Sequence, residues 1–323
     1  MLKLKKIRVG ITAGDPAGIG SEIIIRALTK PSLEKIADFT VIADKWAFEQ
    51  ASALKPQLSD RIRFIDLKNV KAKNFSFGLI KAEYGRAAIE YLDKALEMLK
   101  NGDLDCLVTC PISKEAINLA NFNFSGHTEY LAKRTNTKEI LMMLLNRELK
   151  ISLVTRHIPL KEVALSVNKD NLYKTIFMTF NCLKELFLIK RPRIVVCGLN
   201  PHASDNGLIG EEDDKIIKPV LNKLKRKLRG SIDGPLSADV AVLKAKQKKY
   251  DGVIAIYHDQ ALIPLKLLDS KSGVNLTFGL PFIRTSPLHG TAFDIAGRGI
   301  ASADSLTEAI NLAVKCTLNL RKD

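Results

Sequence analysis

The chain has few aromatic residues, few cysteines and no long apolar run. Aromatic residues make up 6% of its 323 residues, and its five cysteines include no CxxC pair. An odd number of cysteines without a pairing pattern is typical of reduced thiols in a cytoplasmic protein. No apolar run approaches the roughly 20 residues that cross a bilayer, and the N-terminal sequence breaks into glycine and aspartate before a signal-peptide core could form. We therefore expect a cytoplasmic protein that does not enter a membrane.

Acidic residues are fewer than basic ones. The formal net charge is +15, from 50 Lys and Arg against 35 Asp and Glu. The densest basic stretch, at 215–230, follows the acidic segment GEEDD at 210–214, an order that suits the macrodipole of one helix. The sequence has no zinc-finger spacing and no glycine and aromatic pattern of the RNA-binding kind. We therefore expect no nucleic-acid partner, and an anionic small substrate explains positive charge as well.

Apolar, β-branched runs alternate with amphipathic stretches along the chain. Helices are expected from about residue 19, at 86–100 and at 306–320, and strands are expected at 6–12, 39–44, 104–110, 150–155, 193–199, 252–257 and 273–279. This alternation predicts an α/β fold with mostly parallel sheets. Ligands of such sheets bind beyond the carboxyl ends of the strands, and the polar motifs of this chain follow strand ends.

The five histidines all lie in short polar, glycine-containing or proline-containing segments. Three of them, His157, His202 and His258, come directly after apolar strands. Because strand ends of one sheet converge, three neutral imidazoles there could form a divalent-metal site with positions open for a ligand. Five unrelated loop histidines are the alternative interpretation, and the spacing alone does not decide between them.

Two glycine-rich segments follow predicted strands. The segment TAGDPAGIGSE, at 12–22, can hold an anion against backbone N–H groups, although its spacing is not GxGxxG and a tight structural turn is an equal interpretation. The segment HGTAFDIAGRGIA, at 289–301, is either a loop shaped around a ligand or a surface connection.

Several residues beside apolar segments are candidate ligands of a phosphate or carboxylate. They are Lys266, Asn275, Arg284 and Thr285, together with Ser113 and Lys114 after the strand at 104–110. Lys and Arg at such places either bind anions or cover apolar surface with their stems. Asp239 is expected near the start of a helix opened by Gly234 and Pro235. A carboxylate there is a cap, or a general base if a metal and a bound alcohol lie near it.

Five blocks of the sequence together resemble the 4-hydroxythreonine-4-phosphate dehydrogenase family of vitamin B6 biosynthesis. They are TAGDPAGIGSE, SGHTEYLA, NPHASDNGLIGEE, YHDQALIPLK and NLTFGLPFIRTSPLHGTAFDIAGRG, and they follow the family's order from residue 7 to about residue 315. The segment at 289–301 is also similar to the cofactor loop of isopropylmalate and isocitrate dehydrogenases. The chain departs from the family at Ser204-Asp205, where members often have Gly-Glu, and at Ala261, where they often have glycine.

The resemblance implies a two-lobed, mostly parallel α/β fold like that of isocitrate and isopropylmalate dehydrogenases. One lobe would combine residues 1–115 with residues 268–323 on the cofactor side. The other lobe, residues 116–267, would carry the metal ligands and most of the dimer contact.

The resemblance also implies a site shared between the two subunits of a homodimer. The metal ligands, for zinc, magnesium or cobalt, would be His157, His202 and His258. The contacts to a small phosphorylated amino-acid substrate would be His127, Thr128, Lys266, Asn275 and Arg284. The contacts to NAD or NADP would be His289, Gly290 and Asp294. Asp239 matches an acidic position near the metal and is the candidate general base.

The implied reaction is the NAD- or NADP-dependent oxidation of 4-phosphooxy-L-threonine to 2-amino-3-oxo-4-phosphooxybutanoate, which loses carbon dioxide to give 3-amino-2-oxopropyl phosphate. One alternative keeps the fold and the reaction but uses a phosphorylated four-carbon sugar acid, threonate or erythronate 4-phosphate. A more distant alternative is a metal-dependent lyase or hydrolase without nicotinamide, and a third is a non-catalytic anion-binding protein.

Overall fold

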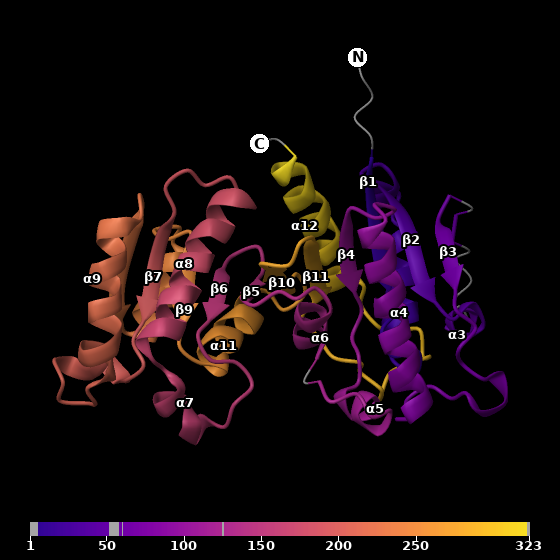
Figure 1. The fold of residues 1–323 in the computed structure, drawn as a ribbon, viewed down its shortest axis with the longest axis horizontal. Helices are drawn as coiled ribbons and strands as arrows, with labels where there is room; N and C mark the ends of the chain where they lie inside the picture. Colours follow the sequence, from indigo (N-terminus) through magenta and orange to yellow (C-terminus); the bar gives the residue numbers. More distant parts are fainter. Residues whose placement is uncertain (1–5, 52–57, 60, 125, 322–323) are drawn as a thin grey trace, which may run out of the picture. The chain divides into compact units, whose positions relative to one another are not determined.

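The computed structural model describes residues 6–51, 58–59, 61–124 and 126–321 (Figure 1). The chain divides into two compact units. Unit 1 is built from Met1–Lys138 and Leu280–Lys322, and unit 2 from Glu139–Gly279. These bounds differ from the lobe boundaries near residues 115 and 267 that the resemblance implies. The segment at 116–138 joins unit 1 because Ile117 and Tyr130 pack against Ile89 and Leu92 in one apolar cluster.

Unit 1 contains a parallel sheet. Its strands are β1 (Ile7–Thr12), β2 (Ala37–Ala43), β3 (Arg63–Asp66), β4 (Cys106–Thr109) and β11 (Ile283–Pro287). They lie in the order β3, β2, β1, β4, β11, and each neighbouring pair runs parallel. Strands buried on both faces read as nearly continuous apolar runs, which explains why β1 and β4 are so apolar.

The helices of unit 1 cover both faces of this sheet. They are α1 (Gly20–Leu28), α2 (Pro31–Glu34), α3 (Lys45–Gln50), α4 (Ala82–Lys100), α5 (Lys114–Leu119), α6 (His127–Arg134) and α12 (Asp304–Leu320), with a 3₁₀ turn η1 at Ala72–Asn74. The crossover through α1 leads outward from β1 to β2, and the crossover through α4 leads back from β3 to β4. Right-handed crossovers in opposite directions place α1 and α4 on opposite faces. Helix α12 contacts α1, β4 and β11 and therefore shares the face of α1.

Unit 2 contains a mixed sheet. Its strands are β5 (Leu141–Leu145), β6 (Lys150–Leu153), β7 (Arg193–Cys197), β8 (Ser231–Leu236), β9 (Gly252–Ala255) and β10 (Val274–Phe278). They lie in the order β10, β5, β6, β9, β7, β8. The pairs β10–β5 and β5–β6 are antiparallel, whereas β6, β9, β7 and β8 run parallel to one another.

Helices cover the sheet of unit 2. The four that pack on it are α8 (Lys169–Glu185), α9 (Lys218–Lys227), α10 (Ala238–Lys246) and α11 (His258–Asp269). The unit also contains a short helix α7 (Leu160–Ser166), a 3₁₀ segment η2 (Pro201–Asp205) and a π turn η3 (Asp213–Ile217). Helices α8 and α9 contact each other on one face of the sheet. The crossovers through α10 and α11 run in the opposite direction across the sheet, so these two helices cover the other face.

The structure confirms the α/β class, and each strand and helix expected above has a counterpart within a few residues. The helix near Asp239 was expected to open at Gly234-Pro235. This expectation was wrong, because these residues belong to β8 and the helix begins at Ala238. All five cysteines are buried free thiols. No helix among the described residues is long and apolar enough to cross a membrane.

The close contact of α4 with α5 depends on Gly85. A Cβ atom at this position would lie 2.1 Å from the Ala116 carbonyl oxygen. We expect Gly85→Ala to lower the free energy of unfolding by about 1–3 kcal/mol, because backbone cannot move aside as a flexible side chain can. Urea unfolding followed by circular dichroism measures the change. The control is Arg86→Ala on the exposed side of the same helix, and equal midpoints for the two variants would contradict this packing.

Candidate active site

The three strand-end histidines follow three neighbouring parallel strands. His157 follows β6, His258 follows β9, and His202 follows β7, and β9 pairs with both other strands. The turn after β6 is tied to the turn after β9, because the Thr155 hydroxyl donates to the Ile256 carbonyl at 2.7 Å. The sheet therefore brings the three histidine-bearing turns to one edge, as the sequence predicts.

His157 and His258 are the two histidines whose rings lie close together. Their ring centroids are 5.6 Å apart, and the rings are inclined by 50°. His258 Nδ1 lies 2.7 Å from Asp259 Oδ1, an arrangement that orients the ring and leaves Nε2 for another partner. His202 is exposed and does not join this pair, and the described part of the chain gathers no group of three side chains that could hold a metal ion.

The His202 turn is held by Asp213, a residue that the sequence reasoning missed. The Asp213 carboxylate is fully buried and accepts hydrogen bonds from the backbone N–H groups of Leu199 and Asn200, at 2.9 and 3.2 Å. It also accepts from Asn200 Nδ2 at 3.1 Å and from the Ser204 hydroxyl at 2.7 Å. The available signal was the acidic run that follows NPHASDNG, which sequence analysis assigned only to a helix start.

The same turn has an unusual backbone conformation. Residues 202–206 all have positive φ, between 44° and 70°. Ser204, at φ 70°, is one of the departures from the family, which often has glycine there. Glycine suits this conformation, and serine instead gains the hydrogen bond to Asp213. The departure from the family at Ser204 therefore affects how the turn that carries His202 is stabilised.

Gln260 joins the His202 turn to the His258 turn. Its Oε1 accepts from the Ile256 N–H at 2.8 Å, and its Nε2 donates to the Gly198 carbonyl at 2.8 Å. The side chain thus bridges the ends of β9 and β7. Polar contacts, as well as strand pairing, therefore hold the three turns in position relative to one another.

The remaining predicted residues of unit 2 lie on three elements. Asp239 is exposed in the first turn of α10, and Lys266 is exposed in α11. Asn275 lies in β10 with its Oδ1 buried and without a hydrogen-bond partner among the described residues. A buried amide oxygen without a partner is costly, so a ligand that donates a hydrogen bond would stabilise it.

Unit 1 brings together Arg284 and His127. Arg284 is buried, and its guanidinium donates to the Thr109 hydroxyl at 2.6 and 3.1 Å. Burial lowers its pKa to about 10, and Glu129 opposes this change, so the side chain remains charged at neutral pH. Burial, with a smaller contribution from Arg284, holds the pKa of His127 well below its usual value. His127 is therefore a neutral imidazole, and its buried Nε2 has no partner in the described structure.

The other residues predicted near these strands are mostly structural. Thr128 is buried. The Ser113 hydroxyl caps α5 by accepting from the Ala116 N–H at 3.1 Å, and the Thr285 hydroxyl donates to the Ala309 carbonyl at 2.8 Å. Lys114 is exposed.

The predicted cofactor loop packs against the glycine-rich turn of unit 1. The Thr291 carbonyl accepts from the Ile19 N–H at 3.0 Å. His289 Nδ1 lies 3.1 Å from the Gly290 carbonyl, whereas its Nε2 is buried without a partner among the described residues. Asp294 is exposed. The loop therefore presents a buried ring nitrogen and an exposed carboxylate.

The segment at 12–22 forms a tight, buried turn. Gly14 has φ +73°, and a Cβ atom there would lie 2.2 Å from the Pro111 carbonyl oxygen. Asp15 Oδ1 accepts from the Ala17 N–H at 2.9 Å, but Asp15 Oδ2 is buried without a partner in the described structure. Burial raises the pKa of the Asp15 carboxyl to about 7, against the hydrogen bond from Ala17. The geometry favours the structural interpretation of this turn over an anion site.

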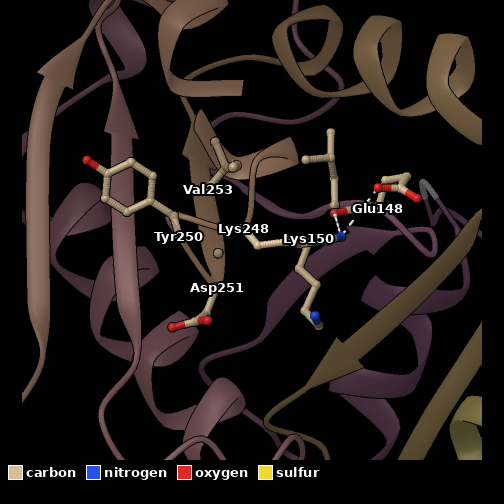
Figure 2. A pocket seen from close by; sticks show the side chains of 9 residues that line it. Glu148, Lys150, Lys248, Tyr250, Asp251 and Val253 are labelled. Atoms are coloured by element: carbon tan, nitrogen blue, oxygen red, sulfur yellow. Dashed lines mark hydrogen bonds and ion pairs between the residues drawn. The ribbon is translucent and has the colours of Figure 1, made fainter. Parts of the chain in front are cut away.

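A small cavity of about 80 Å³ in unit 2 contains none of the predicted residues (Figure 2). Its charged groups have partners. Lys248 Nζ lies 3.3 Å from Glu148 Oε2, and Asp251 accepts from Arg193 at 2.8 Å. This cavity is therefore a less suitable candidate active site than the edge of the sheet that carries the three histidines.

Comparison with known protein families matches residues 19–313 to the family described as pyridoxal phosphate biosynthetic protein PdxA. The chain belongs to this family. A PdxA-family relative from Sulfurihydrogenibium sp. strain YO3AOP1, a 4-hydroxythreonine-4-phosphate dehydrogenase, is 41% identical over 95% of this chain and 98% of its own length. The crystal structure of a 4-hydroxythreonine-4-phosphate dehydrogenase from Klebsiella pneumoniae has a TM-score of 0.85 at 34% identity, covering 98% of this chain and 99% of that one.

Relatives that are named for a different substrate are nearly as similar to this chain as those named 4-hydroxythreonine-4-phosphate dehydrogenase. A protein from Oceanobacillus iheyensis, provisionally named D-threonate 4-phosphate dehydrogenase, is 39% identical over 96% of this chain and 98% of its own length. Both names describe dehydrogenases of phosphorylated four-carbon acids.

The raised pKa of Asp15 predicts a specific dependence of stability on pH. Between about pH 4 and pH 7 the folded chain keeps a proton at Asp15 that the unfolded chain loses, so this group's contribution to stability falls as pH rises. We expect Asp15→Asn to be more stable than the native chain at pH 8, by about 4 kcal/mol, and to lose this advantage by pH 4. Thermal unfolding at both pH values tests this, with Asp103→Asn, an exposed site, as control. An advantage that does not change with pH would contradict the assignment.

The Asp213 hydrogen bonds predict that Asp213→Asn loosens the His202 turn. The amide would turn a donor toward groups that are themselves donors, at a cost of about 1–3 kcal/mol. Hydrogen exchange of the Leu199 and Asn200 amides should become faster, and urea unfolding gives the stability. Asp214→Asn, at a partly exposed neighbour that pairs with Lys218, should change stability by less than about 0.5 kcal/mol. Unchanged exchange at residues 199 and 200 would show that Asp213 does not hold the turn.

Proposed function

We propose that the chain oxidises 4-phosphooxy-L-threonine with NAD or NADP and a divalent metal, as a dehydrogenase of pyridoxal 5'-phosphate biosynthesis. The product, 2-amino-3-oxo-4-phosphooxybutanoate, decarboxylates to 3-amino-2-oxopropyl phosphate. The observation that carries the proposal is the His157–His258 pair at the carboxyl ends of two paired strands. It occurs in a chain whose relatives over nearly its whole length are dehydrogenases of this name.

The metal would be held by His157, His258 and His202, and the proposed ions are zinc, magnesium or cobalt. Imidazole nitrogen is a suitable donor for zinc and cobalt, and the Asp259 contact fixes the ring of His258 for that purpose. When bound, a divalent ion supplies Lewis acidity that lowers the pKa of the substrate hydroxyl and polarises the ketone.

The chain's own residues would bind the substrate and move its proton. The buried, charged Arg284 and the neutral His127 are suited to the phosphate or carboxylate, with Thr128, Lys266 and Asn275 as further contacts. The buried Asn275 Oδ1 accepts a hydrogen bond from the substrate in this proposal. Asp239, exposed at the start of α10, takes the hydroxyl proton as general base.

NAD or NADP would bind at the loop of unit 1 that contains His289, Gly290 and Asp294. The buried His289 Nε2 offers a hydrogen bond, and Gly290 has open space around its Cα. Burial lowers the pKa of His289, so the ring is neutral when it meets the cofactor. Hydride transfer is the cofactor's chemistry, and the chain supplies orientation.

A homodimer with a shared site would cover the apolar surface of unit 2. Exposed apolar side chains gather on α10 and α11, where Leu243, Ile263 and Leu267 are 55%, 58% and 81% exposed. Both helices lie on one face of the sheet. A second copy of the chain is the proposed occupant, because large exposed apolar side chains are stabilised by burial in an interface. The exposed His202 turn contacts α10, so this interface would also lie beside the third proposed metal ligand.

The five cysteines are buried free thiols, which is typical of proteins in a reducing compartment. We therefore propose a cytoplasmic location.

D-threonate 4-phosphate is a second candidate substrate, favoured by the relative from Oceanobacillus iheyensis. It differs from the first candidate by a hydroxyl in place of the amino group. Initial rates of NADH formation with each compound, before and after chelation and again after zinc, magnesium or cobalt is restored, separate the proposals. Turnover of 4-phosphooxy-L-threonine that falls with chelator and returns with metal is expected. A higher kcat/KM for D-threonate 4-phosphate would overturn the substrate, and no NADH in any condition would overturn the reaction.

The proposed metal site predicts that His202→Ala abolishes turnover by losing the ion. A site with two of its three ligands binds metal weakly, so we expect less than a tenth of the native metal content after dialysis, measured by atomic emission. Asn222→Ala, at an exposed position of α9, is the control and should keep native metal and activity. Full activity in a metal-free His202→Ala protein would refute the site.

A further inference from the structure

The structure assigns a second anion site to this chain, at a cavity lined by Lys184, Lys190, Arg191, Lys227 and Arg229, which we call the basic cavity. We propose that it binds a small molecule with two or more linked phosphate groups. The cavity has a volume of about 510 Å³ and is lined by five basic residues and no acidic one. Small-molecule sites typically measure about 300–1,000 Å³, so the space fits a ligand the size of a nucleotide or an inorganic polyphosphate.

The basic cavity gathers five cations around one hollow, without a carboxylate partner in the part of the chain that the structure describes. Some basic residues of unit 2 form ion pairs, among them Lys174 with Glu139, Arg193 with Asp251 and Lys248 with Glu148, whereas other exposed lysines of the unit stand singly on its surface. None of the five cations of the basic cavity has a carboxylate within 4 Å among the described residues. Five like charges around one hollow repel one another, and a polyanion would remove that repulsion.

Helix dipoles account for only part of this arrangement. Lys184 and Lys227 lie in the last turns of α8 and α9, where a cation is stabilised by the carbonyl end of a helix. Lys190, Arg191 and Arg229 lie beyond the ends of these helices, in the segments that lead into β7 and β8. Their common location therefore needs another explanation, and binding of an anion supplies one.

The two loops that carry these residues are fixed in place. The Ser231 N–H donates to the Pro192 carbonyl at 3.1 Å, and Arg193 pairs with Ser231 at the start of β7 and β8. A Cβ atom at Gly230 would lie 2.5 Å from the Pro192 carbonyl oxygen, so the loops approach as closely as glycine permits. Lys227 is held as well, by a 2.8 Å hydrogen bond to the Tyr173 hydroxyl and by the face of the Phe177 ring. A site that is already ordered loses less entropy when it binds.

The basic cavity is separate from the histidine-bearing edge of unit 2. Its residues precede β7 and β8, whereas His202 follows the carboxyl end of β7. The inference therefore does not depend on the proposed reaction. It also gives a role to Lys227 and Arg229 of the densest basic stretch of the sequence, at 215–230, which the proposed active site does not use. A concave hollow favours a compact polyphosphate over a nucleic-acid duplex.

Isothermal titration calorimetry of the full chain with inorganic tripolyphosphate, at 0.15 M salt, tests the site. We expect saturable binding with one site per chain, and binding at least tenfold weaker in the triple variant Lys190→Ala/Arg191→Ala/Arg229→Ala. The matched control, Lys246→Ala/Lys249→Ala/Lys271→Ala, removes the same charge from exposed positions elsewhere in unit 2 and should bind within twofold of the native chain.

Three outcomes would overturn the proposal. The first is no saturable binding of tripolyphosphate, and the second is equal weakening of binding in the two triple variants. The third is that a single-stranded RNA binds more tightly than tripolyphosphate and that the first triple variant abolishes this RNA binding. A parallel titration with ATP distinguishes the source of the phosphates, because equal affinities would show that only the phosphate chain is recognised. Thermal unfolding of both triple variants confirms that they fold.

Discussion

The parallel pairing of β6, β9 and β7 is the constraint on which the candidate active site depends. His157, His202 and His258 are separated along the sequence, but three neighbouring strands that run in the same direction end at one edge of a sheet. Sheet pairing alone sets the turns only approximately. The hydrogen bonds of Thr155, Gln260 and Asp213 join the turns to one another and to the strands, so the edge behaves as one polar network.

Buried polar groups occur at several candidate site residues of both units, and also elsewhere, as at Asp15. Asp213 is buried but accepts four hydrogen bonds, so it stabilises the turn that it holds. Asn275, His127 and His289 each have a buried polar atom without a partner among the described residues. Groups of this kind cost stability in the free protein, and that cost is offset when a ligand supplies the missing hydrogen bond. All three were singled out in the sequence as substrate or cofactor contacts.

The positive charge of the chain has more than one role in this structure. Surface pairs such as Lys174–Glu139 and Lys215–Glu211 neutralise part of it and contribute little to stability. Arg284 keeps its charge in a buried place, where it is suited to an anionic substrate. The five basic residues of the basic cavity are exposed and have no carboxylate partner in the described part of the chain, and they form a separate concentration of charge at the amino ends of β7 and β8. Composition alone could not separate these roles, because each Lys or Arg counts as one positive charge whatever it contacts.

The sequence by itself determined the fold class, most of the strands and the polar turns that follow them. Apolar periodicity records burial directly, so β1, β4, β6, β7 and β9 were visible as apolar runs. The family motifs indicated which polar residues are the candidate site residues. Four strands, β3, β5, β8 and β11, were not predicted. In β8 and β11, proline and glycine, or polar residues, interrupt the pattern, and only pairing with neighbours makes them strands. Likewise, only the tertiary structure showed Asp213 beneath the His202 turn and, around one hollow, five cations without a carboxylate partner among the described residues. The first depends on the irregular path of the chain between residues 199 and 213, and the second on the approach of the segments at 184–191 and 227–229, and periodicity encodes neither.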